Sequence, residues 1–157
     1  VEVMKKRILE INPSCKVNSI FEKFTSQNAN KILDGKIDFV VDAIDNLENK
    51  VLLVKESKLR NLNIISAMGA GNRIGVPKFE ICDVFKTYND GLARKFRKML
   101  KDNNISNLTV AFSSEIALKT SENVVGSTSY GPAMCGATIS GYVINCLINV
   151  WKMLFLW

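Results

Sequence analysis

The apolar residues of this chain follow two alternating periods, which predict a protein built from both helices and strands. Residues 1–10 carry apolar side chains three and four positions apart, as on one face of a helix, and Pro13 ends that helix soon afterwards. Residues 16–21 predict a short strand. Residues 26–33 predict a second helix, for which Ser26 is a suitable N-terminal cap.

The next part of the chain predicts a strand–helix–strand crossover. Residues 37–44 form a short, nearly continuous apolar run rich in β-branched residues, which is typical of a strand covered on both faces. Residues 45–61 predict a helix, and residues 63–67 predict another buried strand. This order gives a sheet that is at least partly parallel. A glycine-rich turn at 68–72 then leads to an alternating segment, 77–83, which predicts a half-exposed strand.

A basic helix dominates the second half of the chain. Residues 90–101 place apolar side chains on one face and cations on the other. The predicted buried stripe is Leu92, Phe96, Met99 and Leu100, and the predicted solvated face is Arg94, Lys95, Arg97, Lys98 and Lys101. Residues 108–112 predict a further strand, and the small polar residues of 119–129 favour a mobile loop.

The chain ends in an apolar segment, 131–157, whose one charged residue is Lys152. Its length meets the criterion for a membrane span, but polar side chains interrupt it. Two interpretations stay open. One is a C-terminal helix buried in the protein, and the other is membrane contact by residues 151–157, whose aromatic residues and lysine suit an interface.

These elements predict one α/β domain with an incomplete Rossmann-like, three-layer fold, a mixed and mainly parallel sheet, and a C-terminal apolar helix. The 157 residues are 47% hydrophobic and 23% charged, which excludes a disordered chain, a collagen-like chain or a disulfide scaffold. There is no histidine, so imidazole bases and His-ligated metal sites are excluded. Four cysteines form no C-x-x-C pair, and we expect reduced thiols in an intracellular protein.

Candidate chemistry follows the strand of residues 37–44. Asp42 and Asp45 come at its carboxyl end, where open α/β sheets bind ligands. Two carboxylates there could hold Mg²⁺ together with a nucleotide phosphate. Alternatively, Asp45 and Asn46 simply cap the following helix. Lys50, one turn further on, could reach an anion or could be solvated surface.

Two further features offer weaker signals. The turn with Gly69 and Gly71 follows the next strand, where glycines could let the backbone approach a ligand closely or could simply serve the turn. Neither a G-x-G-x-x-G motif nor a P-loop follows a strand, so the phosphate cradle of a nucleotide binder is absent from this sequence. The basic helix of 90–101 could track a phosphate backbone, or its charges could be solvated surface.

Five stretches carry a resemblance to a known family. Residues 40–50 read VVDAIDNLENK, residues 1–13 end in I-N-P, and residues 66–74 read SAMGAGNRI. Residues 86–97 resemble K-T-x-x-D-P-L-A-x-x-x-R, and residues 126–132 precede an apolar helix. Together they resemble the ubiquitin-activating-like superfamily, which includes ThiF, MoeB and HesA, and within it the TcdA-like branch.

The resemblance implies an enzyme that uses ATP and Mg²⁺ to adenylate a carboxylate. For the TcdA-like branch this is the carboxylate of threonylcarbamoyladenosine at position 37 of tRNA, which then cyclises by loss of AMP. The resemblance assigns Asp45 as the catalytic residue that works with Mg²⁺–ATP. The expected nucleotide-binding residues are Asp42, Asn46, Lys50, Gly69 and Gly71, and the substrate or RNA candidates are Lys86, Thr87, Asp90, Arg94 and Arg97.

The sequence departs from the branch pattern in ways that shape the expectation. Gly91 stands where the branch usually has proline, and Gly75 where it often has aspartate. The family's first strand and glycine-rich ATP loop precede the segment that Val1 begins. We therefore expect residues 1–157 to be the C-terminal portion of a single ThiF-type adenylating domain, inactive in adenylation by itself.

The partners follow from the same resemblance. We expect tRNA as substrate and a homodimer in the cytoplasm. One alternative is a ThiF/MoeB-type activator of a ubiquitin-like or sulfur-carrier protein. Another is a non-catalytic interaction module attached to a membrane, peripherally or at the mitochondrial surface, through the apolar tail 151–157.

Overall fold

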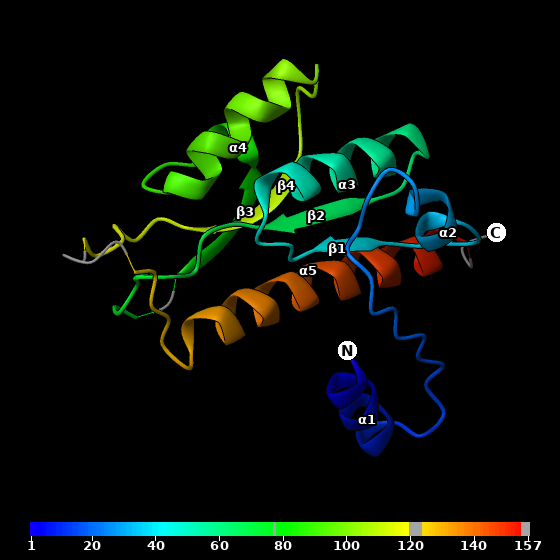
Figure 1. Ribbon diagram of the computed structural model, residues 1–157. Coiled ribbons are helices and arrows are strands. Elements are labelled where there is room, and N and C mark those ends of the chain that lie inside the picture. The colour runs from blue at the N-terminus through cyan, green and yellow to red at the C-terminus, as the bar shows by residue number, and fades with distance from the viewer. Residues whose placement is uncertain (77, 120–123, 155–157) are drawn as a thin grey trace.

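A computed structural model describes residues 1–76, 78–119 and 124–154, with side chains described as far as residue 149. Figure 1 shows three layers, with a sheet in the middle, two helices on one face and one long helix on the other. This arrangement confirms the predicted three-layer α/β fold.

The sheet has four strands in the order β1-β2-β4-β3. Strands β1 (Val40–Asp42), β2 (Ile64–Ala67) and β4 (Thr109–Ser113) run parallel, and β3 (Phe79–Asp83) pairs antiparallel with β4. The sheet is therefore mixed and mainly parallel, as predicted. Among the described residues β1 pairs with β2 alone, so β1 forms an edge of the sheet.

The first strand is shorter than predicted and is covered on one face. Within residues 37–44 only β1 has strand geometry. Val40 and Asp42 are buried, whereas the Val41 side chain is 49% exposed. Full coverage needs a layer on both sides at that edge, and the described elements leave about half of Val41 exposed.

Two helices cover the face of the sheet on which the larger core lies. Helix α3 (Leu47–Leu59) is capped by Asn46, whose side chain accepts from Asn49 N, and α4 (Gly91–Asp102) is capped by Asp90. A short 3₁₀ turn, η1 (Val84–Lys86), leads into α4. Buried side chains from both helices, from η1 and from β4 meet here, including Val54, Val84, Phe96, Leu100, Val110 and Phe112.

The opposite face is covered by α5 (Gly131–Leu154), which contacts β2, β3 and β4. Cys135 and Ile139 are buried against Ile65 and Ala111 in a smaller core. The stretch Gly131–Asn149 is long and apolar enough to cross a bilayer by length and composition, and 17% of it is buried. Its contacts with three strands make α5 a layer of this fold, while the predicted membrane contact of 151–157 falls on side chains outside the described residues.

The N-terminal segment departs from the prediction in two places. Helix α1 (Glu2–Ile11) forms as predicted but has no buried residue, and Figure 1 shows it standing apart from the sheet. The predicted strand at 16–21 is wrong, because a strand needs a partner for its backbone groups and this segment pairs with none of the described strands. Helix α2 (Ala29–Leu33) begins after Asn28, so Ser26 is not its cap.

The start of α4 offers a test of the packing. At Gly91 an added Cβ would meet no atom within 4 Å, and the φ of this glycine is not positive. Asp90 has φ −126° and ψ 111°, the extended conformation that proline requires of the preceding residue. Gly91→Pro is therefore expected to stabilise the protein by about 0.4–1 kcal/mol by restricting the unfolded chain. Urea denaturation measures the change, and a lower midpoint would contradict the geometry described for this helix start.

Candidate functional site

An open cavity of about 1460 Å³ lies beyond the carboxyl ends of β1 and β2. Its walls are the first turns of α3 and α4, the glycine-rich turn after β2, and the first half of α5. Of the residues predicted for the site, six line it: Asp45, Asn46, Gly69, Gly71, Asp90 and Arg94. The position agrees with the general rule for ligands of open α/β sheets.

Asp45 is an exposed carboxylate at this cavity. It lies three residues beyond Asp42, between the end of β1 and the start of α3. No residue that the structure describes forms an ion pair with it, so its charge is available to a ligand. The cap of α3 is Asn46, whose Oδ1 accepts from Asn49 N at 3.0 Å, and this confirms the capping role for Asn46 rather than for Asp45.

Asp42 and Lys50 form an ion pair inside the protein. Lys50 Nζ lies 2.9 Å from Asp42 Oδ2, and both residues are fully buried. Nζ also lies 5.7 Å from the centroid of the Phe96 ring. Neither residue lines the cavity, which corrects the prediction that they contact a nucleotide and also excludes Lys50 as solvated surface. Lys50 is buried because of the tertiary structure, in which the buried Asp42 carboxylate requires a cation beside it.

This pair also fixes the segment that carries Asp45. Asp42 Oδ1 accepts from Ile44 N at 3.0 Å, so the chain turns sharply after β1. Lys50 N donates to Asn46 O at 3.0 Å, in the first turn of α3. Asp45 therefore stands on a short connection whose two ends are joined by a buried ion pair.

The two glycines of the turn serve close packing of the protein against itself. A Cβ at Gly69 would lie 3.2 Å from Asp90 Oδ1, and one at Gly71 would lie 2.4 Å from Val125 Cγ1. Asn72 N donates to Gly126 O at 2.7 Å, which ties the turn to the segment after residue 123. The glycines therefore serve the packing of the turn, while both also line the cavity, and the close approach of a ligand to them stays a prediction. Residues 120–123 of the predicted mobile loop lie outside the described residues.

Asp90 joins the glycine-rich turn to α4. Its Oδ1 accepts from Ala93 N at 2.9 Å and its Oδ2 accepts from Gly69 N at 3.0 Å. Arg73 Nη2 lies 3.4 Å from the same Oδ2, and Arg73 Nε donates to Gly69 O at 3.0 Å. Arg73 was not among the predicted site residues. The signal that could have identified it is a basic residue directly after a glycine-rich turn at a strand end.

The other residues of the basic signature divide into two groups. Arg97 donates from Nη1 to Thr87 O at 3.0 Å and also bonds the Thr87 hydroxyl, so these two residues hold the turn before α4. Lys86 is exposed, and neither it nor the Thr87–Arg97 pair lines the cavity. Arg94 and Lys95 are exposed and do line it.

The donor set is suited to a magnesium ion that is bound mainly by its ligand. No group of three or more His, Cys, Asp or Glu residues able to hold a metal exists in the described part of the chain. Mg²⁺ commonly takes one or two carboxylates and leaves its other positions to water and phosphate. The unpaired Asp45 fits that role, with Glu48 one turn along the same wall.

Comparison with known proteins places this geometry in context. The model of the ThiF family matches residues 1–151. The tRNA threonylcarbamoyladenosine dehydratase of Bacillus subtilis (strain 168) is 31% identical over 167 residues, which cover 95% of this chain and 66% of that protein. The protein of the same name from Haemophilus influenzae is 39% identical over 106 residues, covering 67% of this chain and 41% of that protein.

Solved structures show the same fold. The crystal structure of Escherichia coli tRNA N6-threonylcarbamoyladenosine dehydratase, TcdA, in complex with AMP has a TM-score of 0.89 and 24% identity. It is matched over 97% of this chain and 65% of that chain, and the complex with ATP has a TM-score of 0.87. This chain therefore spans about two-thirds or less of the length of these relatives.

The buried ion pair predicts a specific pattern of stability. Lys50→Met leaves the Asp42 carboxylate buried without its cation, and we expect a loss of about 3–5 kcal/mol in the free energy of unfolding. The double variant Lys50→Met with Asp42→Asn removes both charges and should recover much of that loss. Urea denaturation of the single and double variants gives the coupling energy, and additive losses would show that the two side chains do not interact.

The thiol of Cys135 is predicted to be unreactive. Burial raises the pKa of Cys135 to about 11, an effect that Asp90 adds to and Lys50 opposes. At pH 8 the thiolate is then about one molecule in a thousand, and its reaction with iodoacetamide should be slow and should accelerate up to pH 11. Mass spectrometry of alkylated peptides, with the half-buried Cys15 as internal reference, measures both rates. Equal rates at pH 8 would contradict the burial of Cys135.

Proposed function

The chain belongs to the ThiF family, and from this membership we propose that it forms part of an ATP-dependent enzyme that adenylates a carboxylate. The substrate proposed is the threonylcarbamoyl carboxylate of tRNA, because curated relatives that this chain matches are tRNA threonylcarbamoyladenosine dehydratases. The observation that carries the proposal is the unpaired Asp45 carboxylate at the mouth of a cavity that also receives the N-termini of α3 and α4.

ATP supplies the leaving group for this chemistry. A carboxylate oxygen of the substrate bonds to the α-phosphorus as pyrophosphate departs, and ring closure within the substrate then expels AMP. The balance needs no oxidant or reductant. What the protein must provide is a place for several negative charges and a fixed orientation of the carboxylate.

The described residues meet these two needs. Asp45 would hold Mg²⁺ with the phosphates, and the buried Asp42–Lys50 pair would keep Asp45 in position. The amide groups at the start of α3 and α4 carry partial positive charge that favours phosphate or carboxylate oxygens. Arg94 and Lys95 would attract the RNA to the cavity mouth.

The basic face of α4 favours a nucleic-acid substrate over a carrier protein. Four of its Lys and Arg residues are exposed, on a helix whose first turns line the cavity: Arg94, Lys95, Lys98 and Lys101. Activation of a ubiquitin-like or sulfur-carrier protein uses the same adenylation and differs in the partner. The proposal has four further parts, which follow from the family and the sequence. They are a magnesium ion, a homodimer, a cytoplasmic location and contact of the C-terminal tail with a membrane.

In the complete enzyme of which this chain is proposed to form part, Asp45→Asn is expected to abolish most activity while leaving the fold intact. The exposed side chain has no ion-pair partner among the described residues, so its loss should not change stability. Removing the negative charge that holds the metal should lower the rate by about 100-fold or more. The assay is conversion of threonylcarbamoyl-modified tRNA in the presence of ATP and Mg²⁺, followed by mass spectrometry of the released nucleosides.

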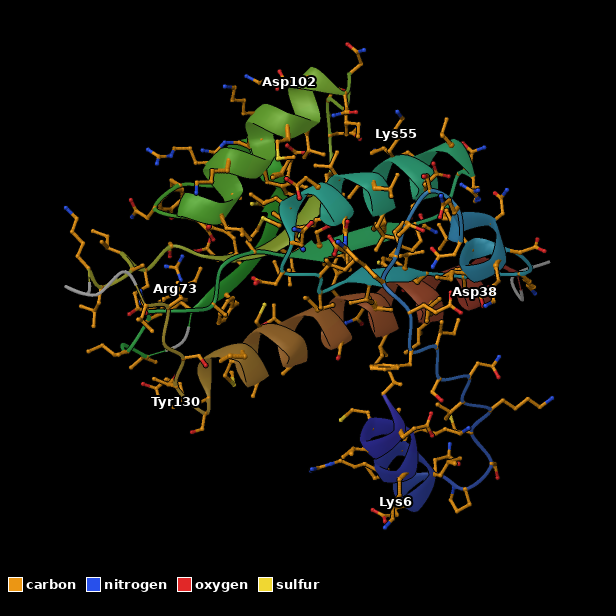
Figure 2. The ribbon with its side chains drawn as sticks, in the orientation of Figure 1. Lys6, Asp38, Lys55, Arg73, Asp102 and Tyr130 are labelled. Carbon is orange, nitrogen blue, oxygen red and sulfur yellow. The ribbon has the colours of Figure 1, made fainter. Side chains whose placement is uncertain are left out.

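Asp38→Asn is the matched control for this variant. Asp38 is also an exposed aspartate, but it precedes β1, and Figure 2 shows it at the opposite end of the sheet from Arg73. Its activity should equal that of the wild type. Equal losses in the two variants, or full activity of Asp45→Asn, would sink the proposal, and turnover with a carrier protein but not with tRNA would favour the alternative substrate.

A further inference from the structure

Arg73 is a buried arginine that uses only part of its hydrogen-bonding capacity. Its side chain is 5% exposed. Nε donates to Gly69 O at 3.0 Å and Nη2 lies 3.4 Å from Asp90 Oδ2. Nη1 is buried and has no hydrogen-bond partner among the residues that the structure describes.

The guanidinium cannot turn to satisfy Nη1 elsewhere. A guanidinium is planar, so the bonds to Gly69 and Asp90 fix the direction of all its N–H groups. The Asp90 carboxylate is held in turn by Gly69 N and Ala93 N, and it contributes the N-cap of α4. The N–H groups of Nη1 are therefore held in place by a network that joins the turn after β2 to the start of α4. A buried donor that lacks an acceptor is costly in free energy.

The surroundings of Arg73 indicate what kind of group would accept these bonds. Arg73 belongs to the cavity wall, and Arg94 and Lys95 of α4 line the same cavity. Asp90 pairs with Arg73, and the carboxylates of Asp45 and Glu48 line the same cavity. The planar N–H groups of Nη1, which have no acceptor among the described residues, suit a carboxylate or phosphate oxygen, which binds arginine with short, charge-assisted hydrogen bonds.

We infer that Arg73 is an oxyanion-binding residue of the cavity, which donates from Nη1 to a ligand while Asp90 holds the guanidinium in place. The inference rests on the proposed function for the identity of that ligand, which has two sources. One is a phosphate of the nucleotide, and the other is the carboxylate of the tRNA substrate. Asp45 and Arg73 then bind opposite kinds of partner, a cation and an anion, from neighbouring strand ends.

The test combines a direct binding measurement with kinetics. Arg73→Lys keeps a cation beside Asp90 but lacks the fork of the guanidinium, and Arg73→Gln with Asp90→Asn removes both charges while asparagine still suits the N-cap. Lys55→Gln is the control for loss of one positive charge, because Lys55 is exposed on α3 and does not line the cavity. Inorganic pyrophosphate is the probe for calorimetric titration, and KM is measured separately for ATP and for modified tRNA in the complete enzyme of which this chain is proposed to form part.

Both Arg73 variants should weaken pyrophosphate binding or raise one KM by about 10-fold or more, and Lys55→Gln should change neither. A raised KM for ATP alone assigns the phosphate, and a raised KM for tRNA alone assigns the carboxylate. Values within twofold of the wild type in all three measurements overturn the inference. If the complete wild-type enzyme binds pyrophosphate through Arg73 but does not convert tRNA, the inference holds and the proposed substrate is wrong.

Discussion

The arrangement of this site depends on two charges buried beneath it. Asp42 and Lys50 lie 2.9 Å apart with no exposure to water, where neither charge could remain without the other. Asp42 belongs to β1 and Lys50 to α3, so the pair joins the three-residue strand to the helix that follows it, and Asp45 lies in the connection between them. A more apolar pair of side chains could fill the same space, but it would not provide the carboxylate oxygen that binds Ile44 N and turns the chain.

The cavity wall is organised by a second carboxylate with a different task. Asp90 combines three bonds that come from separate parts of the chain, to the end of β2, to the start of α4 and to Arg73. The charge of Asp90 is therefore balanced by groups of the protein itself, whereas the charge of Asp45 has no such partner among the described residues. The two aspartates show how the same residue type becomes structural or available for a ligand according to the donors around it.

Periodicity was enough to predict most elements, because the apolar runs of 37–44 and 63–67 and the helix between them need only local sequence. Segment 16–21 could not be assigned in this way, since strand formation there depends on a neighbour that no described strand supplies. The role of Lys50 was also inaccessible, because a lysine in the first turn of a helix normally lies in water. Arg73 was missed for a related reason, as its partner Asp90 is distant in sequence and meets it only in the folded chain.

The edge position of β1 has a consequence for the solution behaviour of this chain. On one side of β1 the backbone amide and carbonyl groups face no other described strand, and the Val41 side chain beside them is about half exposed. Such an edge is a template for an added strand, whether from a different segment or from another molecule. Charged or proline gatekeepers, which natural edges use to prevent such addition, are missing from Val40 and Val41. Self-association of the chain, where it occurs, is therefore expected to begin at the free edge of β1 and to increase with protein concentration.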